Sequence, residues 1–455
     1  MFIEKIKSEG LAHLSYFIGD SGHAAIIDPR RDADIYLQLA GKNNLEITHI
    51  FETHRNEDYV IGSQQIRHST GAQIFHGSQL DFDYGNAVNE GDTFEFGDVI
   101  LKILSTPGHT FESISIALFD KSFSTENPVG VFTGDALFIG DVGRTDFFPD
   151  RAEEVAGLLY ESIHQKILSL GDQCIIYPAH GAGSVCGSGM ASREFSTIGF
   201  ERLTNPALQK NKEQFICHKV NEHHYQPLYF RKMEYLNQTG KVEILHHLPQ
   251  PKPFMPAKFS EAIDSGLQAI DLRAPESSAG TSVPGSLNIP LDMLPAFAGY
   301  FLTYDKPIGL VAEEVGQVQE AVTYLIRLGY DNIACYLKGG LHSWETSGSN
   351  FNSIPSIHAK ELAEKIENNE DFTLLDVRSI DEFNSGHLPG AKHIYVGELP
   401  KYLDQIEKDK LAVTFCNSGK RAAIAASYLK LHNYPDVRNC FGSMMACQAI
   451  GCPLE

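Results

Sequence analysis

Four short polar clusters in the first half of the chain carry side chains that bind metal ions in proteins. They contain His54 with Asp58 in ETHRNEDY, His109 in STPGHT, Asp135 in FTGDAL and His180 in YPAHG. Each cluster follows a run of apolar residues typical of a β-strand. Because side chains at strand ends meet at one edge of a sheet, we expect these distant segments to converge.

The residue types in these clusters are suited to one divalent ion. Two neutral imidazoles and a carboxylate form the triad that suits a non-haem Fe(II), because positions stay open for O2 and a substrate. Zinc with histidine and aspartate ligands is the chemical competitor. A fold that has lost its metal is the remaining alternative.

A second chemical centre is expected at Cys416, in the loop FCNSGKR at 415–421. The loop follows an apolar run and precedes an amphipathic segment, so its backbone N–H groups and a helix N-terminus are expected to face the sulfur. Together with Lys420 and Arg421, they favour a thiolate, which can accept and donate a sulfur atom. The loop residues expected to contact the substrate are Asn417, Ser418, Gly419 and Lys420.

Two kinds of element must position these groups. Short β-type runs such as HAAIIDP, ITHIFETH and SISIALF alternate with helical patterns such as residues 152–170, which predicts sheets covered by helices. The segment PQPKPFMP at 249–256 contains four prolines and is typical of a linker.

An internal repeat follows this linker. Residues 267–290 and 372–394 both place Asp-x-Arg after a β-type run, with Asp271 and Asp376 in equivalent positions. Each copy continues with an apolar run and an amphipathic helix, which predicts two small α/β domains with parallel sheets. Alignment of the copies puts Glu313 where the second copy has Cys416, so the first copy is expected to lack sulfur chemistry and to serve a structural role.

Composition limits the classes of function. The net charge of -21 argues against nucleic-acid binding, and no apolar run is long enough to span a membrane. The N-terminal residues lack the apolar stretch of a signal peptide, and eight cysteines do not form a disulfide framework. We therefore expect a cytoplasmic protein, and we expect it to form a homo-oligomer.

The ordered motifs of the first half resemble those of the metallo-β-lactamase superfamily over roughly residues 1–247. These motifs are THxxxDY, TPGHT, TGDALF, GRTD at 143–146 and YPAHG. The GRTDF segment and the preceding LFIG look most like the persulfide dioxygenase branch. The resemblance implies an αββα sandwich and a mononuclear iron.

The resemblance also implies which residues bind the metal. Persulfide dioxygenases use the positions that correspond to His54, His109 and Asp135 here, while Asp58 and His180 are expected to orient the ligands by hydrogen bonds. The family motif is HxHxDH, and this chain departs from it at Asn56 and Tyr59. A dinuclear zinc hydrolase needs both of those positions, so the departures argue against such an enzyme.

Two further residues of the first half are candidates with open alternatives. Arg144 either clamps an anionic substrate or forms a structural salt bridge. Cys186 lies in a glycine-rich loop, where it either relays a sulfur atom or is a buried, inert thiol. Cys174 and Cys335 lie in apolar runs and are expected in the core. The closing cysteines 440, 447 and 452 are interpreted as small core residues because they lack a paired metal-binding spacing.

The second repeat resembles the rhodanese family over roughly residues 355–455. It has DVR at 376–378, GHLPGA at 386–391 and the Cys-x-x-Gly-x-Arg loop. The four residues between Cys416 and Arg421 favour a sulfurtransferase over a phosphatase, whose loop is one residue longer. The first repeat resembles the degenerate rhodanese domains of multidomain sulfur enzymes.

Together these resemblances imply a persulfide dioxygenase domain at 1–248, a degenerate rhodanese-like domain at 249–350 and an active rhodanese domain at 351–455. The implied partners are O2, sulfite or thiosulfate, and the persulfide of a small thiol such as glutathione or coenzyme A. The implied cofactor is one Fe(II) per chain. A zinc-dependent thioester hydrolase with an appended sulfurtransferase is one alternative, and a non-enzymatic sulfur carrier is another.

Overall fold

The computed structural model describes residues 1–184 and 189–455. The chain divides into two compact units, residues 1–247 with 326–329 and residues 248–325 with 330–455. Cys186, the predicted sulfur relay, lies outside the described residues. The predicted domain limits remain predictions at the level of single residues.

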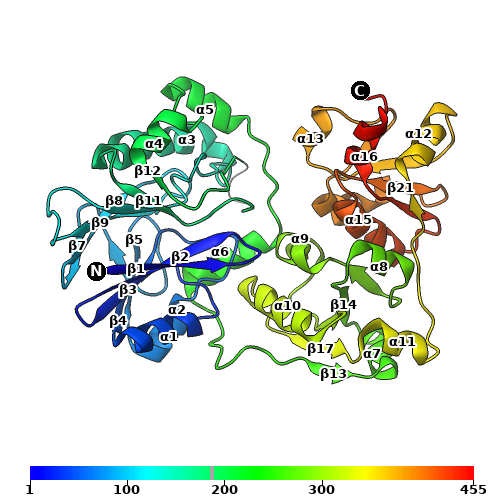
Figure 1. The fold of residues 1–455 in the computed structure, drawn as a ribbon, viewed down its shortest axis with the longest axis horizontal. Coiled ribbons are helices and arrows are strands. Elements are labelled where there is room, and N and C mark those ends of the chain that lie inside the picture. Colours follow the sequence, from blue (N-terminus) through cyan, green and yellow to red (C-terminus); the bar gives the residue numbers. More distant parts are fainter. Residues whose placement is uncertain (185–188) are drawn as a thin grey trace. The chain divides into compact units, whose positions relative to one another are not determined.

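The first unit contains two six-stranded sheets (Figure 1). In spatial order, the first sheet consists of β1 (Phe2–Ser8), β2 (His13–Asp20), β3 (His23–Ile27), β4 (Glu46–Glu52), β5 (Gln73–Gly77) and β6 (Asn86–Val88). The second sheet consists of β12 (Ser196–Thr197), β11 (Ile175–Pro178), β10 (Gly130–Gly134), β9 (Ile114–Asp120), β8 (Val99–Ser105) and β7 (Thr93–Phe96). Both sheets mix parallel and antiparallel pairs.

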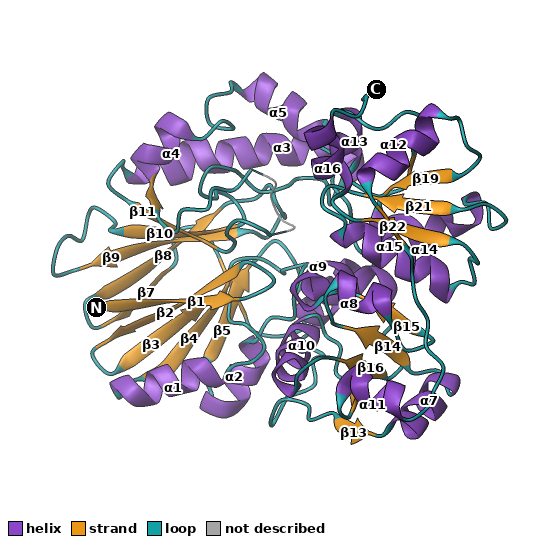
Figure 2. Ribbon diagram, turned by 45° about the vertical axis from the view of Figure 1, so that its right-hand side comes forward, coloured by secondary structure: helices purple, strands orange, loops and turns teal. Residues whose placement is uncertain are grey.

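The two sheets pack face to face, with helices on their outer faces (Figure 2). Strand β3 illustrates this packing, because its side chains alternate between the two faces of its sheet. Ala25 and Ile27 join the core between the sheets, which includes side chains of both. Ala24 and Ile26 join a separate cluster that includes the helix side chain Tyr36. The residues of this unit therefore form an αββα sandwich.

Helices cover the outer face of each sheet. The first sheet is covered by α1 (Asp34–Asn43) and α2 (Ser63–Thr70). The second sheet is covered by α3 (Ala152–Glu161), α4 (Ile198–Thr204) and α5 (Lys212–Val220). Further turns of helix extend α3 to Leu170, so the helix predicted over 152–170 is confirmed. Helix α6 (Tyr229–Thr239) follows α5 in the chain.

The second unit contains two five-stranded sheets in which every pair is parallel. The first has the order β13 (Lys252–Phe254), β17 (Ile333–Leu337), β16 (Ile308–Val311), β14 (Gln268–Asp271) and β15 (Ser286–Asn288). The second has the order β18 (Ser356–Ile357), β22 (Val437–Cys440), β21 (Ala412–Phe415), β19 (Thr373–Asp376) and β20 (Lys392–His393). The two orders correspond strand for strand, which confirms the internal repeat.

Helices surround both of these sheets. Those of the first copy are α7 (Pro256–Asp264), α8 (Pro275–Gly280), α9 (Leu294–Phe301), α10 (Val315–Arg327) and α11 (Gly340–Thr346). Those of the second copy are α12 (Ala359–Glu367), α13 (Ile380–Asn384), α14 (Leu399–Tyr402), α15 (Lys420–Leu431) and α16 (Ser443–Ile450).

The repeated Asp-x-Arg motif is an ion pair at the end of a central strand. Arg273 Nη2 lies 2.6 Å from Asp271 Oδ2, and Arg378 Nη2 lies 2.7 Å from Asp376 Oδ2. Each arginine also donates to a backbone carbonyl eight residues further along, at Thr281 or Gly386. The motif therefore fixes the loop after the strand, which gives it a structural role in both copies.

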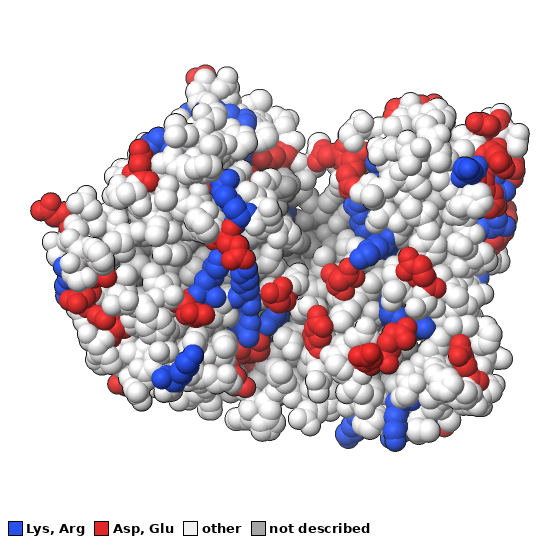
Figure 3. Space-filling model, in the orientation of Figure 1, with Lys and Arg blue, Asp and Glu red and all other residues white. Residues whose placement is uncertain are grey.

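The predicted fold class, an αββα sandwich followed by two α/β domains with parallel sheets, is confirmed. Among the described residues, no helix is both long enough and apolar enough to cross a membrane. Acidic and basic side chains are intermixed on the face shown in Figure 3.

Candidate metal centre and sulfur-binding loop

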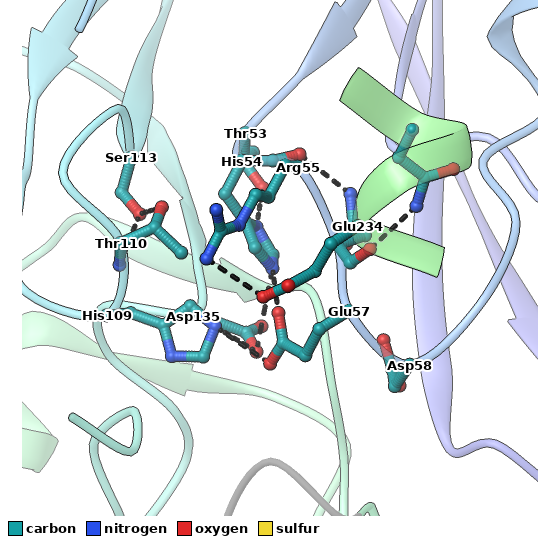
Figure 4. A network of polar contacts seen from close by, with 12 residues as sticks. Thr53, His54, Arg55, Glu57, Asp58, His109, Thr110, Ser113, Asp135 and Glu234 are labelled. Carbon is teal, nitrogen blue, oxygen red and sulfur yellow. Dashed lines mark hydrogen bonds and ion pairs between the residues drawn. The ribbon is translucent and has the colours of Figure 1, made fainter. Parts of the chain in front are cut away.

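Four side chains of the first unit converge on one point (Figure 4). His54 and Glu57 lie in the loop after β4, His109 in the loop after β8, and Asp135 directly after β10. Each side chain is almost completely buried. One ligand atom from each lies within 4.8 Å of those of the other three. The structure thus brings together the three predicted metal ligands and adds Glu57, which the sequence analysis missed.

The contacts within this cluster are short. His109 Nε2 lies 3.1 Å from Glu57 Oε1 and 3.6 Å from Asp135 Oδ2. His54 Nε2 lies 3.8 Å from Glu57 Oε2 and 3.9 Å from Asp135 Oδ2. Ligands about 2.1 Å from one ion lie roughly 3.0 to 3.4 Å apart at octahedral or tetrahedral angles. Shortening the two longest of these separations by about 0.4 to 0.9 Å would therefore bring the four groups to distances that fit a single ion.

Hydrogen bonds on the far side of each imidazole turn its lone pair toward the centre. His109 Nδ1 lies 2.9 Å from the carbonyl oxygen of Arg144, which can only accept, so Nδ1 carries the proton. The Thr53 hydroxyl donates to Asp28 over 2.7 Å and therefore accepts from His54 Nδ1 over 2.9 Å. In both rings Nε2 is the free donor atom, as a metal ligand requires.

The donor set fits a divalent cation. His54 Nε2 and Asp135 Oδ2 are buried and have no hydrogen-bond partner among the described residues. Burial without a partner costs free energy, and a bound cation removes this cost. Both Fe(II) and Zn²⁺ accept imidazole and carboxylate ligands. The four-residue set therefore supports a metal site without separating these two ions.

Electrostatics also favour a positive charge at the centre. Burial opposes ionisation of Glu57, but the imidazoles of His109 and His54 outweigh it and lower its pKa to about 2. Burial likewise opposes a charge on His109, but Glu57 outweighs it and raises the pKa of His109 to about 9. The carboxylates are thus held ionised in a buried site, where a divalent cation can balance them.

His180 and Asp58 lie where the prediction requires them. His180 Nδ1 lies 2.8 Å from Asp135 Oδ1, and His180 Nε2 lies 3.0 Å from Asp58 Oδ2. Both side chains are buried. This chain of hydrogen bonds fixes the Asp135 carboxylate with Oδ2 toward the cluster. Their role as orienting residues remains a prediction that this geometry supports.

The positions that a second metal would need are occupied differently. The Nδ2 of Asn56 donates to the carbonyl of His54 over 2.9 Å, and its neutral amide oxygen is a weaker metal ligand than an imidazole. Burial raises the pKa of Tyr59 well above its usual value, so its phenol stays neutral and is a poor ligand. His180 Nε2 is already bonded to Asp58. These contacts argue for a single ion.

Arg144 is buried and makes a two-pronged salt bridge. Its Nε and Nη2 donate to the two oxygens of Asp146 over 2.6 and 2.7 Å. The guanidinium also lies over the ring of Phe147, 4.9 Å from its centroid. Of the two alternatives left open by the sequence, this geometry favours the structural salt bridge. It also fixes the carbonyl that orients His109.

A cavity of about 450 Å³ lies beside the cluster in the same unit. Its lining includes His180, His13, Lys5, Lys7 and Glu194, and Glu194 pairs with both lysines. His13 is fully buried and its ring lies 5.8 Å from that of His180. The cavity thus reaches a residue that contacts the candidate metal ligand Asp135.

The second candidate centre is the loop between β21 and α15. Cys416 is 1% exposed, and its Sγ accepts a hydrogen bond from the Gly419 N–H over 3.0 Å. Backbone N–H groups at the start of α16 donate to the carbonyls of Cys416 and Asn417. The carbonyls of Cys416 and Asn417 therefore point to α16. Of the several N–H groups predicted to face the sulfur, that of Gly419 forms a hydrogen bond with it among the described residues, and the wider cradle remains a prediction.

The charged residues of this loop have partners. Both Nη atoms of Arg421 donate to Glu382 over 2.6 and 2.7 Å. Lys420 Nζ lies 2.5 Å from Asp292, and Asn417 and Ser418 are exposed. The positive charge of Arg421 is therefore balanced within the domain. The roles predicted for these residues in catalysis or substrate binding remain predictions.

The equivalent loop of the first repeat has a different internal arrangement. The side-chain carbonyl of Gln317 accepts from the backbone N–H groups of Glu313 and Glu314, over 2.9 and 3.2 Å. In the second repeat, the N–H group equivalent to that of Glu313 is that of Cys416, which donates to the Ser443 hydroxyl. The lack of sulfur chemistry in the first repeat remains a prediction, which rests on Glu313 at the position of Cys416.

The remaining described cysteines fit the interpretation as core residues, with one exposed exception. Burial raises the pKa of Cys174, Cys335 and Cys440 to about 12, 11 and 12. These three thiols belong to apolar clusters, so the predicted core positions of Cys174 and Cys335 are confirmed. Cys217 is exposed.

Comparisons with known families agree with this architecture. The metallo-β-lactamase superfamily matches residues 9–180. The rhodanese-like domain matches twice, at residues 255–347 and 358–449. The second of these matches contains Cys416, and the first contains Glu313 at the equivalent position.

Individual proteins are similar to large parts of the chain. The mitochondrial persulfide dioxygenase ETHE1 of Mus musculus is 34% identical over 214 residues, which cover 44% of this chain and 74% of that protein. The hydroxyacylglutathione hydrolase GloC of Haemophilus influenzae is 29% identical over 211 residues, covering 42% of this chain and 89% of its own. A crystal structure of a metallo-β-lactamase from Staphylococcus aureus subsp. aureus COL is 33% identical, with a TM-score of 0.66, and covers 74% of this chain and 98% of its own.

Proposed function

Because this chain belongs to the metallo-β-lactamase superfamily and carries two rhodanese-like domains, we propose that it oxidises a small thiol persulfide and transfers its sulfur. The first reaction is R–S–SH + O2 + H2O → R–SH + HSO3⁻ + H⁺. The observation that carries the proposal is the buried cluster of His54, His109 and Asp135, with two neutral, weaker ligands, Asn56 and Tyr59, at the positions that a second ion would use. Similarity to ETHE1 supports persulfide and O2 as the reactants.

The metal at this site is proposed to be one Fe(II), which would supply one-electron chemistry with O2 and a binding position for sulfur. The residues of the chain fix the geometry. His109 and His54 present Nε2 because Arg144 and Thr53 hold their Nδ1 atoms. His180 fixes Asp135. The cavity beside His180 has room for a small persulfide.

Cys416 is proposed to carry the sulfur atom in the last domain. The thiolate takes the outer sulfur of the persulfide, giving Cys–S–S⁻ and R–SH, and sulfite then takes that sulfur to give thiosulfate and the free thiolate. The Gly419 N–H, 3.0 Å from Sγ, stabilises the thiolate form of Cys416 before it accepts the sulfur and after it has donated it. In the reverse direction, the same residue would feed persulfide to the metal site. Two sites in one chain raise the effective concentration of the shared intermediate.

A zinc thioester hydrolase is the second candidate, favoured by the similarity to the hydrolase GloC. Quantifying iron and zinc in the purified full chain and measuring O2 uptake with glutathione persulfide separates the two. We expect iron and persulfide-dependent uptake; zinc as the only metal, with thioester cleavage instead, would refute the proposal.

Two variants test the division of labour between the sites. We expect His109→Ala to abolish O2 uptake, and Cys416→Ser to preserve uptake while removing thiosulfate formation. His68→Ala and Cys217→Ser, at exposed positions outside both sites, are the matched controls. If Cys416→Ser alone stopped O2 uptake, the two sites would not act as proposed.

A further inference from the structure

Glu57 occupies a position in the metal cluster that neither the motif nor the family comparison assigns. It lies three residues after His54 in the same loop, and its side chain is 1% exposed. A fully buried carboxylate is costly unless it has a cationic partner. Its oxygens face the two imidazoles, so the position of Glu57 needs an explanation within the cluster.

The contacts of Glu57 and Asp135 with the two histidines can be compared directly. The closest approach to His109 Nε2 is 3.1 Å for Glu57 and 3.6 Å for Asp135. The closest approach to His54 Nε2 is 3.8 Å for Glu57 and 3.9 Å for Asp135. Glu57 is thus at least as close to both histidines as the predicted carboxylate ligand. An ion held by the histidines and Asp135 is also within reach of Glu57.

An ion pair with a protonated His109 accounts for the contact of Glu57 Oε1, but it does not account for the second oxygen, which faces His54. The Nδ1 of His109 faces the Arg144 carbonyl, so a neutral ring presents a lone pair toward Glu57. Two acceptors 3.1 Å apart repel each other unless a proton or a cation lies between them. The His54 contact has the same form, because Thr53 fixes the proton of that ring on Nδ1. A single cation bound to all four groups satisfies both contacts at once.

We infer that Glu57 is a fourth protein ligand of the metal ion, which makes the site a two-histidine, two-carboxylate centre. The inference rests on the metal site of the proposed function. If the ion is six-coordinate, four protein ligands leave two coordination positions for substrates, whereas three protein ligands would leave three. The two carboxylates also balance the +2 charge of the ion. Two coordination positions are sufficient for one persulfide sulfur and one O2 molecule.

Glu112 provides a matched control in the same region. Its side chain is also buried, at 3% exposure, and its Oε1 accepts from the Arg55 N–H over 3.2 Å. It does not belong to the four-residue cluster. Replacing either glutamate by glutamine removes one buried carboxylate while keeping the shape of the side chain.

The test titrates Co²⁺ into the full chain after removal of metal with a chelator. We expect Glu57→Gln to weaken Co²⁺ binding by at least about 10-fold. Loss of a group that only orients a metal ligand can weaken binding by a similar factor, so affinity is measured together with the absorption spectrum. We also expect Glu57→Gln to change the visible absorption bands of bound Co²⁺, which depend on ligand number and geometry. Glu112→Gln should leave the affinity and the bands unchanged.

A second variant keeps the test decisive if Glu57→Gln does not fold. Glu57→Asp retains the charge but withdraws the carboxylate by one methylene, so we expect the same change in the Co²⁺ bands. Parental bands and affinity in the folded variant would overturn the inference. O2 uptake with persulfide by the parental chain tests the proposed function separately. If the parental chain takes up O2 but the Co²⁺ bands do not change on replacing Glu57, only this inference is refuted. If the bands change but the parental chain takes up no O2, only the proposed function is refuted.

Discussion

The hydroxyl of Thr53 offers a test of how the metal ligands are positioned. It donates to Asp28 Oδ2 over 2.7 Å and accepts from His54 Nδ1 over 2.9 Å. Thr53→Val removes both hydrogen bonds with little change in shape, while the backbone N–H of residue 53 still donates to Asp28. The substitution therefore removes the group that fixes the proton of His54 on Nδ1, without touching the metal ligands themselves.

The size of the effect follows from these two bonds. A hydrogen bond to a charged group contributes about 1.5–3 kcal/mol and a neutral one about 0.5–1.5 kcal/mol, so we expect the folded first unit to lose about 2–4.5 kcal/mol. Loss of an orienting partner of a metal-binding histidine typically weakens metal binding about 10- to 100-fold. That range corresponds to about 1.4–2.7 kcal/mol.

The assay is competition for Zn²⁺ or Fe(II) with a chelator of known affinity, under argon for iron, combined with urea unfolding of the metal-free chain. Thr48→Val is the matched control. The Thr48 hydroxyl also lies 2.8 Å from the Nδ1 of the next residue, His49, but both residues lie in β4 and neither belongs to the metal cluster. We expect Thr48→Val to leave metal affinity unchanged. Parental affinity in Thr53→Val, or an equal loss in Thr48→Val, would refute the reasoning.

Two further predictions concern the sulfur-binding domain. Arg421 outweighs the opposing effect of burial and lowers the pKa of Glu382 to about 2, so the stabilisation by this pair is present above about pH 4.5 and is lost as the pH falls toward 2. Acid titration of Glu382→Gln, followed by circular dichroism, should therefore show a smaller loss of stability between these pH values. An acid transition identical to that of the parental chain would contradict the assignment. Gly419 has φ +105°, and an added Cβ would lie 3.1 Å from the Phe441 Cα. We expect Gly419→Ala to introduce about 1–3 kcal/mol of strain and to reduce thiosulfate formation with O2 uptake unchanged, and parental thiosulfate formation would show that the loop tolerates the side chain.

The elements and most of the candidate ligands could be predicted because they depend on local patterns. His109 and Asp135 each follow an apolar run, and β8 and β10 end just before them. Alternation along a strand also shows which residues face each core, as Ala24 and Ala25 do in β3. The equivalent positions of Asp271 and Asp376 revealed the repeat, because the same ion pair forms in both copies.

The contacts that could not be predicted depend on how loops approach one another. Glu57 stands at a variable position of the motif, and only the path of the loop turns it toward His109. Its spacing of three residues from His54 was the available signal, although such a spacing is common in loops without a metal. The partner of Thr53 is Asp28, 25 residues earlier, and the partner of Arg421 is Glu382, 39 residues earlier. No periodicity in the sequence indicates such pairs.

The two rhodanese-like domains show that the fold and the sulfur chemistry depend on different contacts. Both copies keep the parallel sheet order and the Asp-x-Arg ion pair. They differ in the hydrogen bonds of the loop: the Gly419 N–H donates to the sulfur of Cys416 in one copy, whereas the Glu313 N–H donates to the side-chain oxygen of Gln317 in the other. The donor equivalent to the Glu313 N–H is that of Cys416, which donates to the Ser443 hydroxyl. The identity of the residue at the cysteine position and the hydrogen bonds of the loop therefore both differ, while the sheet order and the ion pair stay the same.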